Sequence, residues 1–206
     1  HPTTADSLAK LRPVLDGGAM TSTLFFVTGI GSTLVPALTY DTDITTQYLI
    51  NPYWPGGGYL RLHTLTGPPD VPVFTTTTLW PVGAPWSDGL PDAPQLGSTT
   101  NIQTNDARLM NAVIRNGSMW LCHTAGLPSS APTGCAIQWW EVDVRNGSAT
   151  RGQVLQTGFI DHSVSGGLTP GMFYYFPSIS VNRNDDVLIG FSGSSSTMYV
   201  GAFYAF

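Results

Sequence analysis

The sequence predicts an all-β fold, and three observations support that prediction. Charged residues make up only 10% of the chain, with a single lysine and a single glutamate, so the solvent-facing sides of helices would lack their usual residues. Hydrophobic residues make up 42% of the chain and aromatic residues 11%, which is too much apolar material for a disordered chain. Short apolar segments alternate with turns rich in glycine, proline, asparagine and aspartate, which is the pattern of strands.

The first 20 residues are predicted to form an N-terminal arm or a linker, because proline and glycine interrupt them. One short helix is predicted at residues 6–11, with Asp6 as its N-cap. Residues 21–28 are apolar and β-branched, which predicts a lone strand before the next part of the chain.

Between residue 30 and the end of the chain, one pattern occurs three times. Each unit has a strand, a tight polar turn, a second apolar strand and a third aromatic strand, and the first two units add a fourth strand. The Asn116-Gly117 turn suits the positive φ angles of a type I′ hairpin. The units span about residues 30–85, 105–162 and 172–206, with the two fourth strands at residues 73–79 and 154–160.

Repeated units of four antiparallel strands are the sequence pattern of β-propeller blades. A β-sandwich with Greek-key connections is the alternative. Propellers have four to eight blades, whereas this chain has about three, so the exposed blade faces should be covered by something else. We therefore expect a partial ring that is completed by another copy of the chain or by the remainder of a longer precursor. Residues 21–28 would then complete a blade of that partner.

Residues 106–120, 138–142 and 176–192 resemble blades of sialidase-like β-propellers, in particular those of uncharacterised secreted bacterial proteins. The resemblance covers about residues 30–206 and implies the propeller fold in a secreted, extracellular bacterial protein. The Asp-box of sialidases, Ser-x-Asp-x-Gly-x-x-Trp, is absent, and no arginine triad or Tyr/Glu nucleophile pair is recognisable. No catalytic residue is therefore carried over.

Charge excludes several kinds of partner. The formal net charge is −5, and the seven arginines are scattered along the chain, which does not fit nucleic acid or an anionic membrane surface. The longest apolar runs are strand-sized, so no membrane insertion is expected. The sequence predicts no cofactor and leaves a glycan or another protein as the partner.

The two cysteines, Cys122 and Cys135, flank a loop with turn residues at 126–134. If this loop joins two antiparallel strands, the cysteines would lie opposite each other at the spacing of a disulfide. The alternative is two small buried hydrophobic side chains. Two cysteines without a second ligand pair make too few ligands for zinc.

Candidate catalytic residues begin with Glu141, because glycoside hydrolysis normally uses two carboxylates. Glu141 follows Trp139 and Trp140, whose indoles would raise the pKa of a neighbouring carboxyl and could stack against a sugar. The alternative is an exposed Glu141 on an outer strand, with both tryptophans packed between blades. Asp106 and Arg108 share a strand face and could bind a carboxylated sugar or form a structural salt bridge.

The remaining candidates lie in loops. Asp161 and His162 could form half of a base and orienting pair, but no nucleophile motif accompanies them. Tyr53 and Trp54 are ligand-contact candidates, or a cap over one end of the ring. Asn182, Asn184 and Asp186 have the 1-3-5 spacing of oxygen ligands that begins a calcium-binding loop. The glycine and the glutamate expected later in such a loop are missing, so a hairpin turn is favoured for these residues.

The predicted function is a non-catalytic extracellular β-propeller module that acts as a scaffold or as a binding surface for protein or glycan. One alternative is a glycoside hydrolase of the sialidase-like type, whose site is completed by blades outside this chain. The other alternative is a structural subunit of a larger assembly.

Overall fold

The computed structural model describes residues 5–10, 17–18, 21–26, 30–31, 33–53, 58–68, 71–79, 84–161 and 171–206. This part of the chain consists of strands and turns, without a helix. The all-β prediction is therefore confirmed. The predicted fourth strands at 73–79 and 154–160 begin and end at the residues where the structure has them.

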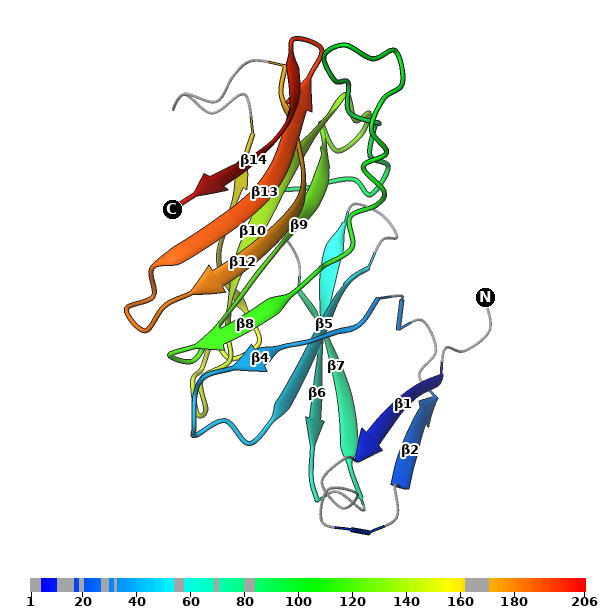
Figure 1. Ribbon diagram of the computed structural model, residues 1–206. Helices are drawn as coiled ribbons and strands as arrows, with labels where there is room; N and C mark the ends of the chain where they lie inside the picture. The colour runs from blue at the N-terminus through cyan, green and yellow to red at the C-terminus, as the bar shows by residue number, and fades with distance from the viewer. Residues whose placement is uncertain are drawn as a thin grey trace.

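Three sheets account for most of the described chain (Figure 1). The first sheet has the order β3 (Val35–Pro36), β5 (Gln47–Tyr53), β6 (Tyr59–Thr66) and β7 (Val73–Leu79). The second has the order β4 (Leu38–Thr39), β8 (Ala112–Arg115), β9 (Ser118–Leu127), β10 (Gly134–Asp143) and β11 (Val154–Ile160). The third consists of β12 (Phe173–Val181), β13 (Val187–Ser195) and β14 (Met198–Ala205).

The N-terminal strands differ from the sequence prediction in two ways. Strand β1 (Ala5–Lys10) occupies the place of the predicted helix at residues 6–11, so that prediction is wrong. Strand β2 (Thr21–Phe26) pairs antiparallel with β1 and is not a lone strand. A helix of about six residues is too short to be stable without tertiary support, and backbone pairing with β2 gives the segment the partner that a helix would lack.

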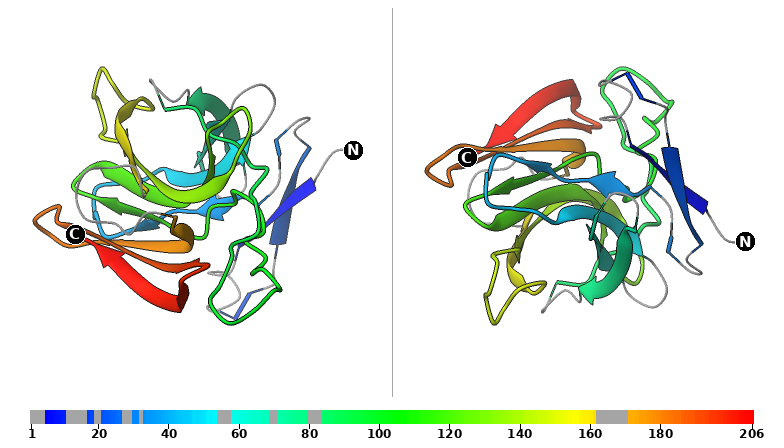
Figure 2. Two further views of the ribbon diagram at one scale, coloured as in Figure 1. Left: turned by 90° about the horizontal axis from the view of Figure 1, so that it is seen from above. Right: turned by 90° about the horizontal axis from the view of Figure 1, so that it is seen from below.

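The second sheet lies between the other two, as the views along the stack show (Figure 2). Successive residues of β9 alternate between its two faces. Met119 and Leu121 belong to the core shared with the first sheet, whereas Trp120 and Cys122 belong to the core shared with the third. Both faces of the second sheet are therefore buried, which explains why its strands are apolar at nearly every position.

One stretch of chain belongs to two sheets. The first strand of the first unit is divided into β3, which pairs antiparallel with β5, and β4, which pairs parallel with β8. Between them, the Ala37 N–H donates to the Tyr48 carbonyl at 2.9 Å, and the Tyr40 N–H donates to the Ile114 carbonyl at 3.2 Å. Backbone hydrogen bonds therefore connect the first sheet to the second.

The two outer faces of the stack differ. On the first sheet, the Phe25 ring stacks on Phe74 with 5.4 Å between the ring centroids, and the Ile30 carbonyl accepts a hydrogen bond from Asn51. On the third sheet, Leu188, Tyr204 and Phe206 are 43%, 77% and 86% exposed. Val73 on the first sheet and Leu155 on the second are 51% and 40% exposed, so the third sheet differs in carrying the most exposed of these side chains, Tyr204 and Phe206.

The predicted disulfide is wrong, because Cys122 and Cys135 are free and buried. Cys122 pairs with Trp139, whereas Cys135 pairs with Gly126, four residues farther along β9. At the rise of a strand this offset is about 13 Å, well beyond the reach of a disulfide. The strands continue to Leu127 and Gly134, so the hairpin loop is shorter than predicted. The alternative of two buried hydrophobic side chains is the one observed.

Candidate functional site

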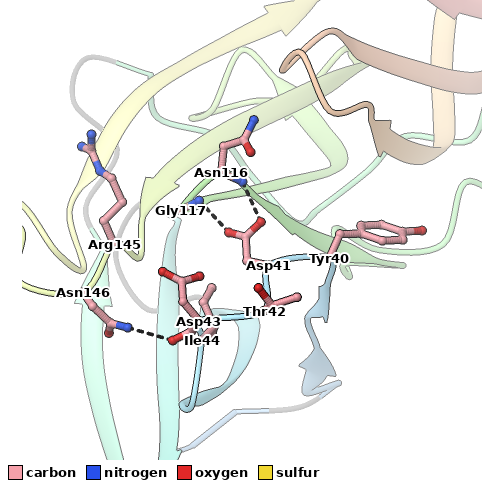
Figure 3. A pocket seen from close by; sticks show the side chains of 9 residues that line it. All are labelled: Tyr40, Asp41, Thr42, Asp43, Ile44, Asn116, Gly117, Arg145 and Asn146. Carbon is pink, nitrogen blue, oxygen red and sulfur yellow. Dashed lines mark hydrogen bonds between the residues drawn. The ribbon is translucent and has the colours of Figure 1, made fainter.

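Polar turns of the three units meet at one end of the sheets, and Figure 3 shows those of the first two units. The Asp41 carboxylate accepts hydrogen bonds from the backbone N–H groups of Asn116, at 2.8 Å, and Gly117, at 2.7 Å. The φ angles of Asn116 and Gly117 are 50° and 77°, as a type I′ turn requires. The hairpin of the second unit is thus fixed to the loop of the first.

The Asn116 side chain extends this contact to the third unit. Its Nδ2 donates to the Arg183 carbonyl at 3.1 Å and to Asp185 Oδ1 at 2.9 Å. Beside it, Asn146 Nδ2 donates to the Asp43 carbonyl at 3.2 Å. We call the residues that join the units in this way the turn cluster: Asp41, Asp43, Asn116, Asn146 and Asp185.

An open pocket of about 530 Å³ lies within the turn cluster. Its most prominent carboxylate, Asp41, already uses both oxygens for the hairpin of the second unit. The Asn116 amide is likewise used by the third unit. These contacts show that Asp41 and Asn116 serve the joint between the sheets, and the Asp43 carboxylate is the acidic group of the lining that they leave free of a hydrogen bond among the described residues.

A second cavity, of about 420 Å³, lies between the outer strands of the second and third sheets. Trp120 on β9 and Trp139 on β10 form one wall, and their rings stack with 6.3 Å between centroids and 27° between planes. Trp120 is only 7% exposed, whereas Trp139 is half-buried. We call this cavity the aromatic groove; its other lining residues are Gln156, Ile160, Asp185, Asp186, Val187, Ile189, Ala205 and Phe206.

Carboxylates line the aromatic groove opposite the indoles. Asp185 Oδ1 accepts from Asn116, and Asp186 Oδ2 accepts from Asn182 at 2.7 Å. The second oxygen of each carboxylate accepts no hydrogen bond from the described residues. The described lining includes no lysine or arginine. The groove therefore combines an aromatic surface with unoccupied anionic acceptors.

Glu141 lies on the same face of β10 as Trp139, but both of its oxygens are engaged. Oε1 accepts from the Ser118 hydroxyl at 2.6 Å, and Oε2 accepts from Gln156 Nε2 at 2.7 Å. Trp140 points to the opposite face of β10 and is fully buried in the core shared with the first sheet. Of the two tryptophans that precede Glu141, Trp139 therefore lines the groove and Trp140 does not.

The other predicted catalytic residues lie apart from Glu141. Asp106 forms an ion pair with Arg108 at 2.7 Å, and Arg108 is the leading cause of the lowered pKa of Asp106. Asp161 lines a different cavity near the β9–β10 turn. His162 lies outside the described residues. Neither Asp106 nor Asp161 lines the aromatic groove.

The remaining predicted residues have local roles. Tyr53, at the end of β5, lies under the Arg61 guanidinium, whose central carbon is 3.5 Å from the ring centroid. Trp54 lies outside the described residues. Asn182 Oδ1 accepts from the backbone N–H groups of Asn184, at 2.8 Å, and Asp186, at 3.0 Å. The hairpin-turn interpretation of residues 182–186 therefore agrees with the structure.

Asp143 forms a buried polar network at the end of β10. Its side chain is 0% exposed and contacts Arg145 Nη2 at 2.9 Å and Nε at 3.0 Å. The hydroxyls of Ser148 and Thr150 each donate to Asp143 Oδ2 at 2.5 Å. The Arg145 guanidinium, supported by these hydroxyls, holds the pKa of Asp143 well below its usual range.

Trp120 and Gln156 of the aromatic groove were not among the residues predicted from the sequence. The alternation of side chains along β9 places Trp120 on the same face as Cys122, and this much could be predicted from the sequence. That Trp120 meets Trp139 depends on the register of β9 and β10, which the sequence does not specify. Gln156 enters the groove only because β11 pairs with β10.

Comparison of the chain with protein-family models, with curated proteins and with solved structures gives no match. Among the described residues, no three histidine, cysteine, aspartate or glutamate side chains are grouped as they would be around a metal ion. The same part of the chain contains no helix that is long and apolar enough to span a membrane.

Proposed function

We propose that the chain is an arc of a β-propeller that serves as a non-catalytic, extracellular scaffold and binds glycan in its aromatic groove. The propeller proposal is supported by strand order, because each of the three sheets follows the order of the chain outward from its first strand. The parallel pairing of β4 with β8 gives further support. Strand β4 directly continues β3, the first strand of the first sheet, so this pairing brings the first strands of two successive blades side by side, as expected around a propeller axis.

Hydrogen bonds also link the first strands of the second and third sheets. Asn111, just before β8, donates from Nδ2 to the Ile179 carbonyl at 2.7 Å. Its Oδ1 accepts the Ile179 N–H at 3.2 Å. One side-chain amide thus occupies both backbone groups of a residue in β12, which is the first strand of the third sheet. The first strands of all three sheets are therefore joined in sequence.

The single observation behind the glycan-binding proposal is the Trp120 and Trp139 pair beside unoccupied carboxylate oxygens. The apolar C–H face of a pyranose ring can be buried against an indole, while a few polar groups fix its hydroxyls. Asp185 and Asp186 offer acceptors for those hydroxyls and give the groove a negative charge. The ligand class is therefore a neutral sugar or an amino sugar, and a sialic acid would be repelled.

The surroundings of Glu141 support a role without catalysis. A general acid needs its proton directed at the glycosidic oxygen, yet both Glu141 oxygens accept hydrogen bonds from Ser118 and Gln156. Two carboxylates about 5–10 Å apart would be expected to flank a scissile bond. Asp106, the predicted partner, is instead paired with Arg108.

Titration calorimetry with three sugars tests the glycan proposal. They are the neutral hexamer of N-acetylglucosamine, the cationic hexamer of glucosamine, and the anionic sialyllactose. We expect binding of at least one of the first two and none of sialyllactose. Replacing Trp139 with alanine removes the accessible indole and should weaken binding by about tenfold or more. Tyr40→Ala is the matched control, because Tyr40 is 57% exposed and lies outside the groove lining and outside the third sheet.

Three outcomes contradict the glycan proposal. The first is that none of the sugars binds the folded chain. The second is that sialyllactose binds most tightly, which would favour the sialidase-like alternative. The third is that Trp139→Ala, shown to be folded by circular dichroism, binds as tightly as Tyr40→Ala.

For the scaffold role, we propose that a second copy covers the third sheet. Residues 187–206 contain no charged side chain, so this face meets a copy without charge repulsion, and two sets of three sheets fall within the range of a closed ring. Strand β2 of one copy would lie next to β14 of the other. The expected solution mass is twice the 22.0 kDa of one chain, and a stable species of single-chain mass contradicts the closed ring.

A further inference from the structure

The same tetrapeptide, Arg-Asn-Gly-Ser, occurs twice in the chain, at residues 115–118 and 145–148. An asparagine that precedes glycine is chemically labile, because glycine has no Cβ to hinder the approach of its backbone nitrogen to the asparagine side chain. Since both copies have identical local sequence, any difference in their reactivity must come from the structure around them.

In the first copy, both reacting groups are held by hydrogen bonds. The backbone nitrogen of Gly117, which would be the nucleophile, donates its N–H to Asp41 Oδ2 at 2.7 Å. The amide nitrogen of Asn116, which would be the leaving group, donates to the Arg183 carbonyl and to Asp185 Oδ1. Attack would require these hydrogen bonds to break together, and they join the three units.

In the second copy, the same two groups are exposed and make few hydrogen bonds. Asn146 and Gly147 are both exposed, and the Gly147 N–H has no hydrogen-bond partner among the described residues. A Cβ placed on Gly147 would meet no atom within 4 Å. The Asn146 side chain makes a single hydrogen bond, from Nδ2 to the Asp43 carbonyl at 3.2 Å.

We propose that Asn146 is a site of spontaneous deamidation, and that Asn116 is protected from it. The Gly147 backbone nitrogen loses its proton and forms a bond to Asn146 Cγ, while the bond from Cγ to Nδ2 breaks and the nitrogen leaves as ammonia. The resulting succinimide takes up one water molecule and opens to aspartate or isoaspartate. The net reaction consumes one water, releases one ammonia and adds about 1 Da to the chain.

The modification acts on the joint between the first two sheets. The new carboxylate cannot donate to the Asp43 carbonyl, so the one hydrogen bond of Asn146 in the turn cluster is lost. It also adds negative charge to a pocket that Asp41 and Asp43 already line. Deamidation therefore weakens the contact between the loop at 41–44 and the connection that precedes β11.

Peptide mapping by mass spectrometry of the intact, folded chain, incubated in mildly alkaline buffer, tests the proposal. We expect deamidation at Asn146 to proceed about tenfold or more faster than at Asn116. In denaturant the two sites should react at similar rates, because their tetrapeptides are identical. Equal rates in the folded chain, or faster reaction at Asn116, would overturn the proposal.

Two variants separate protection by structure from other causes. Gly147→Ala has room for its Cβ and should slow the reaction at position 146. Asp41→Ala releases the Gly117 N–H and should speed the reaction at position 116 while the chain remains folded. If Gly147→Ala leaves the rate at Asn146 unchanged, the proposed nucleophile is wrong. If a folded Asp41→Ala leaves Asn116 unreactive, the proposed protection is wrong.

Discussion

Replacing Asp143 with asparagine is expected to destabilise the fold by about 2 kcal/mol, the cost of mismatching the hydrogen bonds of a buried side chain, since Asp143 is buried whereas its partner Arg145 is 53% exposed. The carboxylate accepts from Arg145, Ser148 and Thr150 within a buried site. An asparagine amide would direct a donor at groups that are themselves donors. Urea denaturation, followed by tryptophan fluorescence, measures the difference in the free energy of unfolding.

Asp106→Asn is the matched control for this change. Asp106 and Arg108 repeat the Asp-x-Arg contact, with Nε and Nη2 of the arginine each 2.7 Å from the carboxylate. Here, however, both side chains are more than 40% exposed, so the expected loss is about 1 kcal/mol or less. Equal losses in the two variants would show that burial of Asp143 contributes nothing.

The stabilisation by Asp143 also depends on pH. Its pKa is lowered in the folded state, so the stabilisation is present above the unfolded pKa of about 3.9 and is lost as the pH falls toward the folded value. The difference between wild type and Asp143→Asn should therefore be constant near neutrality and shrink below about pH 4. His63 and His123, whose pKa values burial lowers to about 4, destabilise both proteins equally in acid and cancel in this difference.

Gly58→Ala is expected to produce the second large effect, a loss of about 3 kcal/mol that combines backbone strain and overpacking. Gly58 has a φ angle of +70°, and an added Cβ would lie 2.7 Å from Cε2 of Trp86 and 2.8 Å from its carbonyl oxygen. Trp86 is fully buried, so any shift of its ring must displace its neighbours in the core. The same denaturation measurement applies.

Gly171→Ala separates the two contributions for Gly58. Gly171 has a φ angle of +79°, but an added Cβ there would meet nothing within 4 Å. The control therefore contains the backbone strain of about 1 kcal/mol without the clash. A Gly58→Ala chain as stable as Gly171→Ala would show that the Trp86 indole and backbone can yield at no cost.

After the N-terminal segment, where a helix was predicted in place of β1, the sequence was sufficient to predict most of the strands, because apolar alternation and turn residues are local signals. The hairpin at Asn116-Gly117 and the fourth strand at 154–160 are examples. The disulfide prediction failed because the register of β9 and β10 is set by how far both strands continue before the turn. Likewise, Asp106 and Asp143 have the same local motif, and only the packing of distant strands determines which of them is buried.

The aromatic groove could be predicted only in part for the same reason. Trp139 could be predicted as a sugar-contacting residue from its indole, and Asp186 could be placed in a polar turn. Their proximity depends on the packing of the second sheet against the third, which no local signal specifies. Trp120 therefore became recognisable as part of the groove only with the three-dimensional arrangement.

The division of one stretch of chain between β3 and β4 has a consequence for cooperativity. The first and second sheets cannot separate without the loss of backbone hydrogen bonds in both, so they should open as a single unit. The third sheet is joined to the second by side chains, such as the Asn111 amide, and by an apolar core. It can therefore open by itself, and subglobal unfolding should begin there while the first two sheets remain folded.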